Sequence, residues 1–325
     1  MNLNDLTPEQ RTFLYEHGAN VHKYDIPTKT AARAMNVSEW TVRQVKKYMA
    51  EHGAPDETDR PGSRILVIGD AHAAPDQDLT RFTVLSRFIE DQGREAMAEG
   101  IPFVVMCIGD FTDMHSLSSY DEGKLSGEGS RYHRDCESGI KAQELLFEHI
   151  SPEVRKYGHF AMTIGNHEYR LKRLCNDKPA LHGTLSYDDL KYDEFWDETC
   201  DFQEVIIIED IAFSHYHPSG VMGRAVSGVN IGRSLIQKGL MSSVQGHSHL
   251  LNHSTLTDYA GKRMHGLSVG CWFMHDEDYA KRANDMFWRG ICVLENSKDG
   301  DYDLCTYSAE RLFRKYDFDG NGKIR

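Results

Sequence analysis

Three features are scarce or missing in this chain of 325 residues, and each absence excludes a class of protein. The seven cysteines are odd in number and never form a C-x-x-C pair, which argues against a disulfide framework and against a cysteine zinc site. No apolar run approaches the length of a membrane span. The segment MNLNDLTPEQRTFL lacks the basic and then apolar pattern of a signal peptide. We therefore expect a cytoplasmic protein with reduced thiols and no membrane contact.

An excess of positive charge is also missing, because the formal net charge is −13. The whole surface should not attract nucleic acid, so any such contact has to be local. Hydrophobic residues make up 40% of the chain and charged residues 27%, which is enough apolar material for a sizeable core in one large or two smaller domains. The unusual total is 17 histidines, and their positions matter more than their number.

The first part of the chain, residues 1–55, carries helical signals. Thr7 and Pro8 form an N-cap with proline at the first helical position. Residues 26–49 predict two helices that break at Asn36-Val37-Ser38, with Ser38 capping the second helix. The apolar positions expected to pack on one face are Ala31, Ala32, Met35, Val37, Val42 and Val45. A short helix, a tight turn and a second helix with polar exposed positions resemble a helix-turn-helix DNA-binding unit.

Local charge favours DNA as the partner of this segment. Residues 28–48 contain five basic residues against the single acidic Glu39. The candidate DNA contacts on the second helix are Thr41, Arg43, Gln44, Lys46 and Lys47. The alternative is a small helical hairpin that packs against the main domain or mediates oligomerisation.

An α/β domain is expected over residues 64–312, after a linker over 56–63 that is rich in Pro, Gly and charge. Apolar runs at 65–68 and 103–108 flank a predicted helix around 79–99, and the second half of the domain is richer in strands. Residues 116–135 form the most loop-like piece. The tail, residues 313–325, includes DFDGNGK, which copies the first half of an EF-hand loop without its bidentate Glu. We interpret it as a polar terminal tail.

Five apolar runs end in residue types that bind metals. They are ILVIGDAH (65–72), VVMCIGDFTD (104–113), FAMTIGNHE (160–168), IAFSHYH (211–217) and SSVQGHSH (242–249). In open α/β sheets, ligand sites form beyond the carboxyl ends of the strands. A single Asp or His at a strand end is usually a cap or a surface group, but five such ends in one chain predict one common site. Its residues would be Asp70, His72, Asp110, Asn166, His215, His247 and His249.

The series D-x-H, G-D-x-x-D, G-N-H-E, H and G-H-x-H, over residues 64–310, resembles the calcineurin-like metallophosphoesterases. The resemblance implies a four-layer α/β/β/α sandwich with a two-metal centre at the sheet ends. It implies that Asp70, His72 and His249 bind one metal, that Asp110 bridges both metals, and that Asn166, His215 and His247 complete the second. Oxygen and imidazole ligands suit Mn, with Fe, Zn, Ni or Mg as alternatives.

The chemistry that the resemblance implies is attack on phosphorus by a metal-activated hydroxide. His167, next to the ligand Asn166, is placed to assist the leaving group. Asp113 resembles the carboxylate that orients the catalytic histidine of the family. Glu168 is expected to anchor the turn by hydrogen bonding rather than to react.

Two positions leave alternatives open. Either His215 or His217 could be the metal ligand; His215 comes first after the strand and matches the family better, so His217 is assigned to substrate contact or to support of a ligand. Arg170 could bind the substrate phosphate or could be an ordinary surface charge.

The substrate class rests on two observations. Protein phosphatases of the family carry Arg-Gly after the second Asp of G-D-x-x-D, whereas this chain has Met114-His115. The helix-turn-helix-like segment favours a DNA phosphodiester, since tethering raises the local substrate concentration. The combination resembles DNA-associated phosphoesterases encoded by bacteria or their phages. The alternatives are a nucleotide or small-molecule phosphodiesterase with a regulatory N-terminal module, and a DNA-binding regulator whose phosphoesterase fold is inert.

Overall fold

The structure is a computed structural model that describes residues 6, 8–14, 26–35, 37–53, 60–277 and 280–316. Four sequence features fall partly or wholly outside the described residues. They are the Thr7 cap, the break at Asn36, most of the 56–63 linker and the EF-hand-like stretch 317–323.

The first sheet has six strands and begins with the apolar runs of the sequence. Its order is β13 (Asp301–Ser308), β12 (Gly290–Lys298), β1 (Ser63–Ile68), β2 (Phe103–Cys107), β3 (His159–Thr163) and β4 (Glu198–Cys200). The strands β1 to β4 are parallel, whereas β12 is antiparallel to β1 and to β13. The carboxyl ends of β1, β2 and β3 therefore lie at one edge of this sheet.

The second sheet has five strands and comes from the second half of the domain. Its order is β10 (Leu251–Thr257), β11 (Arg263–Val269), β9 (Ser242–Gln245), β6 (Ile211–Phe213) and β5 (Ile206–Ile208). The strands β6, β9 and β11 are parallel. A two-stranded ribbon of β7 (Pro218–Ser219) and β8 (Arg224–Ala225) follows β6.

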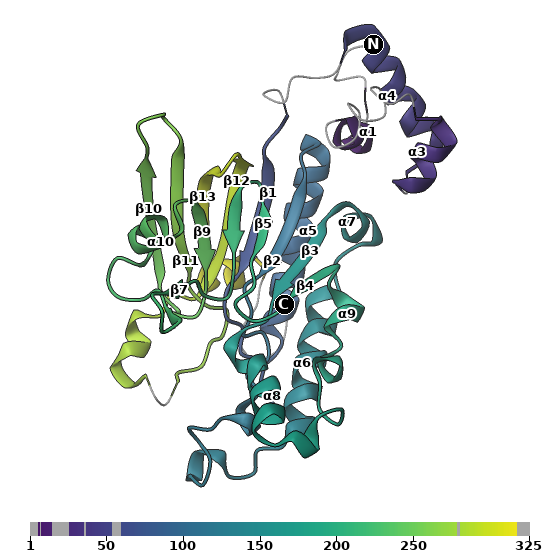
Figure 1. Ribbon diagram of the computed structural model, residues 1–325. Coiled ribbons are helices and arrows are strands. Elements are labelled where there is room, and N and C mark those ends of the chain that lie inside the picture. Colours follow the sequence, from purple (N-terminus) through teal and green to yellow (C-terminus); the bar gives the residue numbers. More distant parts are fainter. Residues whose placement is uncertain are drawn as a thin grey trace.

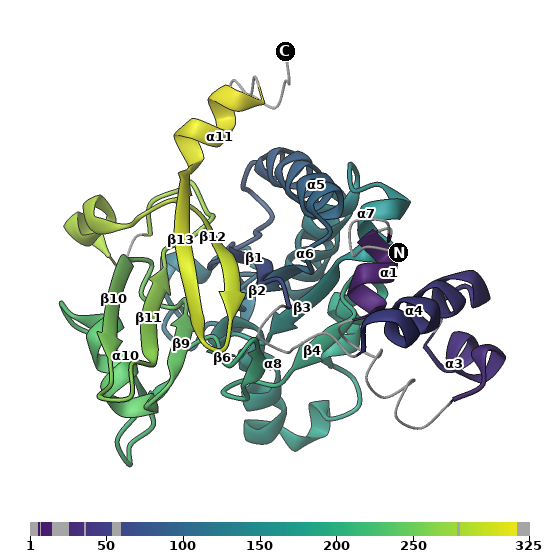
Figure 2. The same ribbon diagram turned by 90° about the horizontal axis from the view of Figure 1, so that it is seen from above.

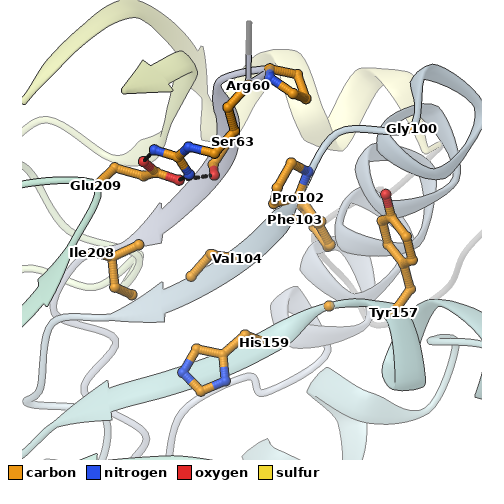
Figure 3. A pocket seen from close by; sticks show the side chains of 12 residues that line it. Arg60, Ser63, Gly100, Pro102, Phe103, Val104, Tyr157, His159, Ile208 and Glu209 are labelled. Atoms are coloured by element: carbon orange, nitrogen blue, oxygen red, sulfur yellow. Dashed lines mark hydrogen bonds and ion pairs between the residues drawn. The ribbon is translucent and has the colours of Figure 1, made fainter. Parts of the chain in front are cut away.

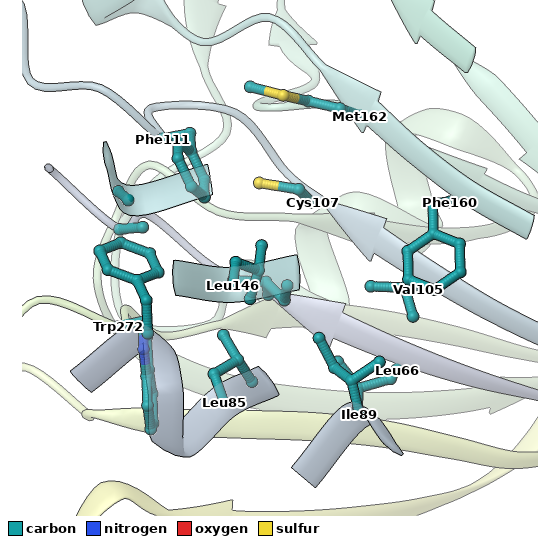
Figure 4. Packing of buried hydrophobic residues seen from close by; sticks show 14 of the residues in the cluster. Leu66, Leu85, Ile89, Val105, Cys107, Phe111, Leu146, Phe160, Met162 and Trp272 are labelled. Carbon is teal, nitrogen blue, oxygen red and sulfur yellow. The ribbon is translucent and has the colours of Figure 1, made fainter. Parts of the chain in front are cut away.

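The two sheets pack face to face, because the strands of the first sheet are apolar on both faces. Ile65, Val67 and Val104 face the second sheet and share a cluster with its Phe213 and Val244. The alternate side chains, among them Leu66, Val105 and Phe160, pack against helices on the outer face (Figure 4).

Helices cover the outer faces of both sheets. The helices beside the first sheet are α5 (Arg81–Glu99), α6 (Tyr132–Phe147), α7 (Pro152–Tyr157), α8 (Asn166–Asp177), α9 (Tyr192–Phe195) and α11 (Ala309–Lys315). One helix, α10 (Ile231–Gly239), packs on the second sheet through a cluster that includes Val226 and Leu235. The short 3₁₀ turns are η4 (His115–Leu117), η5 (Leu125–Gly127), η6 (Pro179–Leu181), η7 (Tyr187–Leu190) and η8 (Lys281–Met286). The arrangement confirms the expected α/β/β/α layers (Figure 1).

The N-terminal helices form a small unit with its own core. They are α1 (Pro8–Phe13), α3 (Thr28–Ala34) and α4 (Glu39–His52). As expected, Ala31, Ala32, Val42 and Val45 are buried together, and the Ser38 side chain caps α4 by accepting a hydrogen bond from the Thr41 backbone N–H. Helix α1 lies beside the C-terminal end of α5, where a side chain at Gly100 would meet the Arg11 guanidinium.

Three boundaries differ from the sequence expectation. Strand β1 begins at Ser63, inside the predicted linker, because Ser63 pairs with Ser297 of β12. Helix α11 continues to Lys315, past the predicted start of the tail, since Phe313 packs against the core. Helix α6 begins at Tyr132, within the stretch predicted as loop. Among the described residues, the structure contains no helix both long and apolar enough to cross a membrane.

The end of the sandwich where β1, β2 and β3 begin holds a cavity of about 230 Å³. The Arg60 guanidinium and the Ser63 hydroxyl both bind the Glu209 carboxylate at its edge, and Tyr157 and His159 line the opposite side (Figure 3). The N-terminal helices also lie at the amino ends of β1, β2 and β3, at the top of Figure 1, so the carboxyl ends of these strands are at the other end of the molecule (Figures 1 and 2).

Candidate metal centre

The seven residues predicted from strand ends come together at the carboxyl edge of the two sheets. Asp70 and His72 follow β1, Asp110 follows β2 and Asn166 opens α8 after β3. On the second sheet, His215 follows β6, and His247 and His249 follow β9. Parallel strands from both sheets end at this edge, so residues far apart in the sequence meet here.

One group of candidate ligands consists of Asp70, His72 and His249, whose ligand atoms lie within 4.8 Å of one another. His249 Nε2 is 3.0 Å from Asp70 Oδ2. His72 Nδ1 is 2.8 Å from Glu277 Oε1, whereas its buried Nε2 has no hydrogen-bond partner among the residues that the structure describes. A buried imidazole nitrogen without a partner is costly unless it binds something else, and a metal ion fits that need.

The second group consists of Asp110, His215 and His247, whose ligand atoms also lie within 4.8 Å of one another. His215 Nδ1 is 2.8 Å from the Ile108 carbonyl oxygen, so this nitrogen donates and Nε2 faces the centre. Asn166 Oδ1 lies 2.8 Å from His215 Nε2, which places its oxygen in the same group.

Asp110 lies between the two groups. Its Oδ2 is 3.3 Å from His215 Nε2 and 3.8 Å from His72 Nε2. Its Oδ1 accepts a hydrogen bond of 2.8 Å from the His167 backbone N–H, which fixes the carboxylate in place. A carboxylate in this position is suited to contact two cations at once.

The backbone at the centre is strained. The φ angles of His72, Asp110, His247 and His249 are 43°, 47°, 65° and 60°, in the left-handed region that costs residues with a side chain on the order of 1 kcal/mol each. Strain of this kind gathers at functional sites, where it aims side chains that regular strands would direct elsewhere.

Two glycines of the motifs are needed for close approach to the carboxylates. A Cβ at Gly165 would lie 2.1 Å from Asp110 Oδ1, and one at Gly246 would lie 2.3 Å from Asp70 Oδ1. Any larger residue would displace these carboxylates, which explains the glycines in G-N-H-E and G-H-x-H.

Electrostatics at the centre favour a bound cation. Burial raises the pKa of Asp110, but the histidines His167 and His215 outweigh burial and hold that pKa well below its usual range. Burial disfavours the charged form of His215, but Asp110 prevails and raises the pKa of His215 to about 9. At His247 burial prevails and lowers the pKa to about 4, so this imidazole is neutral and able to bind a metal. The buried carboxylates of Asp70 and Asp110 are therefore stable only with positive charge beside them.

His167 lies on the flank formed by the first group. Its ring stacks on that of His72 with centroids 4.5 Å apart, and its Nδ1 is 2.8 Å from both the carboxylate and the backbone oxygen of Asp113. Nδ1–H therefore donates to Asp113, and Nε2 faces the centre. Burial raises the pKa of Asp113, but the hydrogen bond from His167 outweighs it and lowers the pKa to about 2.

Arg170, predicted as a substrate contact, supports this pair. Its Nη1 donates to the backbone oxygens of Asp113 and Met114 at 2.8 and 3.2 Å. The structure thus gives Arg170 a positioning contact on the Asp113 loop.

Glu168 anchors the turn, as its sequence position predicted. The fully buried carboxylate accepts hydrogen bonds from the backbone N–H groups of Asp110, Thr112 and Gly165 at 2.9 to 3.1 Å, and from the Tyr192 hydroxyl at 3.0 Å. It ties the ends of β2 and β3 together beneath the centre.

Glu277 is a residue of the site that sequence reasoning missed. It follows β11 in an irregular segment, and its carboxylate binds His72 Nδ1 at 2.8 Å and His275 Nε2 at 3.3 Å. Phe273 of the same segment stacks on the His72 ring, with centroids 4.6 Å apart. The cluster His275-Asp276-Glu277 in the sequence was the available signal, but it follows no strand-end motif.

His217 does not join either group. Its Nε2 lies 3.2 Å from the Val244 carbonyl oxygen, and its backbone N–H donates to the Gln245 side chain. The ring therefore stabilises the loop after β6, and of the two alternatives the structure brings His215 to the centre. A substrate contact through the His217 ring is not supported.

Some of the predicted DNA contacts on α4 are exposed, whereas others are buried or hydrogen-bonded within the N-terminal unit. Thr41 was expected to be exposed but is only 1% exposed, because its hydroxyl and backbone N–H complete the Ser38 cap. Lys46 donates to the Ile26 carbonyl oxygen. Gln44 is half-buried, whereas Arg43 and Lys47 are exposed, with Arg43 paired to Glu39 at 2.8 Å.

The comparisons with known proteins agree with this geometry. Residues 63–288 match the family model described as calcineurin-like phosphoesterase. No curated protein matches the chain.

Proposed function

Because the chain belongs to the calcineurin-like phosphoesterase family, with residues 63–288 matched, we propose that it hydrolyses phosphodiester bonds of DNA with two divalent metal ions. Hydrolysis of a phosphoester by a metal-dependent enzyme is the activity of the family. The observation that carries the proposal is the place of Asp110, whose Oδ2 lies between His72 and His215 of the two candidate ligand groups.

The donor set fits two hard or borderline divalent ions. Asp70, His72 and His249 would hold one ion, Asn166, His215 and His247 the other, and Asp110 would bind both. These are oxygen and imidazole donors without a thiolate, which favours Mn²⁺ over soft-metal chemistry, with Fe, Zn, Ni and Mg as alternatives. When bound, such a pair polarises the phosphoryl group and lowers the pKa of a bound water.

The protein's own groups act on the leaving oxygen. His167 is held by Asp113 through Nδ1, so Nε2 is the atom that meets the substrate. A proton on Nε2 would pass to the leaving oxygen as the bond to phosphorus breaks. Arg170 and Glu168 hold the loops that carry Asp113 and Asp110, which keeps this geometry fixed.

DNA as the substrate is supported by the N-terminal unit, whose exposed Arg43 and Lys47 lie on α4. This unit lies at the amino ends of the strands, remote from the candidate centre. It would therefore act as a tether that raises the local concentration of DNA, rather than as a guide for the bond that is cut.

The separation of the N-terminal unit from the candidate centre also favours a second candidate function. This is a nucleotide or small-molecule phosphodiesterase in which the N-terminal unit is regulatory. Both candidates predict diester hydrolysis at the same centre, and they differ in whether loss of the unit changes the substrate preference.

Hydrolysis of bis-p-nitrophenyl phosphate and p-nitrophenyl phosphate in the presence of Mn²⁺ tests the proposal. The expected result is turnover of the diester. Turnover of the monoester alone would indicate a phosphatase, and turnover of neither would indicate a DNA-binding regulator with an inert fold.

A further inference from the structure

Three aromatic side chains form a continuous row beside the second ligand group. Tyr169 lies on α8, Phe202 follows β4, and Tyr216 follows β6. The Tyr169 and Phe202 rings are stacked with centroids 4.5 Å apart, and Phe202 meets Tyr216 edge-on at 5.4 Å. Tyr216 in turn lies 4.8 Å from the ring of His247. We name these three residues the aromatic shelf.

The shelf is partly open to solvent and fixed in place. Tyr169 is 36% exposed, and Phe202 and Tyr216 are half-buried. Gln203 donates a hydrogen bond of 2.7 Å to the Tyr216 hydroxyl, which holds that ring against His247. Tyr169 is the most exposed of the three rings, so it offers the shelf's surface for a ligand.

The shelf and His167 lie on opposite flanks of the centre. His167 stacks on His72 of the first group, whereas Tyr216 contacts His215 and His247 of the second group. Tyr169 follows Asn166 by three residues, so both lie on the same face of α8. Since His167 meets the leaving oxygen, the shelf lies beside the group that stays on phosphorus.

We propose that the aromatic shelf binds the nucleobase of the nucleoside that remains attached to the phosphoryl group. This inference rests on the proposed phosphodiesterase function and narrows its substrate to nucleoside esters. Every base has a π-face, and stacking on aromatic side chains is the common, sequence-tolerant way in which proteins hold single-stranded nucleic acid. Tyr216 places the row directly beside the candidate metal ligands, so the sugar of the bound nucleoside would lie between the phosphoryl group and the Tyr169–Phe202 pair.

The test compares two substrates with the same leaving group, thymidine 5′-(p-nitrophenyl) phosphate and methyl p-nitrophenyl phosphate, with the full chain and Mn²⁺. The expected wild-type result is a higher kcat/KM for the thymidine ester. In Tyr169→Ala the ratio of the two kcat/KM values should fall by about tenfold, within the range that loss of one base–aromatic stack produces. Tyr169→Phe keeps the ring and should keep the ratio. Tyr259→Ala, which removes a fully exposed tyrosine of the β10–β11 turn, is the matched control.

The outcomes distinguish failure of the shelf assignment from failure of the proposed phosphodiesterase function. If the wild type hydrolyses both esters and Tyr169→Ala leaves their ratio unchanged, the shelf serves packing alone and the assignment is wrong. If the wild type hydrolyses neither ester, the phosphodiesterase proposal itself fails, and the shelf assignment fails with it.

Discussion

At the scale of single residues, the candidate metal ligands depend on neighbouring groups that hold them in position by hydrogen bonds. Asp110 is held by the His167 backbone N–H, His215 by the Ile108 carbonyl, and His72 by Glu277. The strand-end motifs predicted the seven residues that meet, because each follows an apolar run directly. Glu277 was not predictable, since it lies 205 residues from His72 and its place depends on a loop path that no local pattern specifies.

His167 should act on the leaving group without binding metal. His167→Ala should keep its metal content and lose rate by about 10²- to 10⁴-fold on a substrate with a poor leaving group, the span of a general acid. The loss should shrink for p-nitrophenyl esters, because p-nitrophenolate leaves without a proton. Steady-state rates on an alkyl and a p-nitrophenyl diester measure the difference, and equal losses on both would remove His167 from this role.

Glu277 should orient His72 for metal binding. Glu277→Ala frees the His72 ring and should weaken Mn²⁺ binding by about 10- to 100-fold, the usual effect of losing such a partner. Glu277→Gln retains an acceptor for the Nδ1–H and should lose less.

Titration calorimetry with Mn²⁺ measures the change without relying on turnover. The matched control is Asp276→Ala, since the neighbouring Asp276 is 77% exposed and pairs with Arg289 rather than with a histidine. Wild-type affinity in Glu277→Ala would show that the contact is incidental.

At the scale of elements, a strand could be predicted from the sequence where its apolar residues form a continuous run. Strands β1 and β2 are buried along their whole length, and their apolar residues 65–68 and 103–107 appear in the sequence as continuous runs. Strands β10 and β13 were not predicted individually, because LNHSTLT and DYDLCTYS mix polar and apolar residues on partly exposed strands. The first turn of helix α6 was predicted as loop, since the helix opens with the polar stretch 132–135, and the packing of its buried face shows that this turn is helical.

The cap of α4 gives a prediction at this scale. Ser38 Oγ accepts from the Thr41 N–H at 3.0 Å, and loss of such a cap costs about 1 kcal/mol. In Ser38→Ala the α4 amides should exchange with deuterium about fivefold faster than in the wild type. Ser38→Asp restores an acceptor and should exchange near the wild-type rate. Unchanged exchange in Ser38→Ala would show that the cap contributes nothing to this helix.

At the scale of the whole molecule, the N-terminal unit and the candidate centre lie at opposite ends of the sandwich. The sequence predicted both parts but not their arrangement, because the linker pattern carries no information on where the helices dock. In the structure, α1 contacts the C-terminal end of α5.

DNA binding through α4 should depend on salt. Replacing both Arg43 and Lys47 by Ala should weaken DNA binding and reduce the slope of log K against log salt by about 2, because each of the two side chains would neutralise one phosphate. Hydrolysis of bis-p-nitrophenyl phosphate should hardly change, because the candidate centre is remote from α4. Arg94→Ala is the control, since Arg94 is exposed and paired with Glu90 four residues away, as Arg43 is with Glu39. Equal binding and slope in the double variant would favour the nucleotide phosphodiesterase over the nuclease.

The central claim is that hydrolysis requires two metal ions and that Asp110 would bind both of them. The most direct test is to add Mn²⁺ stepwise to the metal-free chain and to Asp110→Asn while following bis-p-nitrophenyl phosphate hydrolysis and bound metal. Wild-type activity should reach its plateau only as about two equivalents bind. Asp110→Asn should stay folded, bind less metal and lose turnover. Full wild-type activity at one equivalent, or near-normal turnover with two bound ions in Asp110→Asn, would contradict the account.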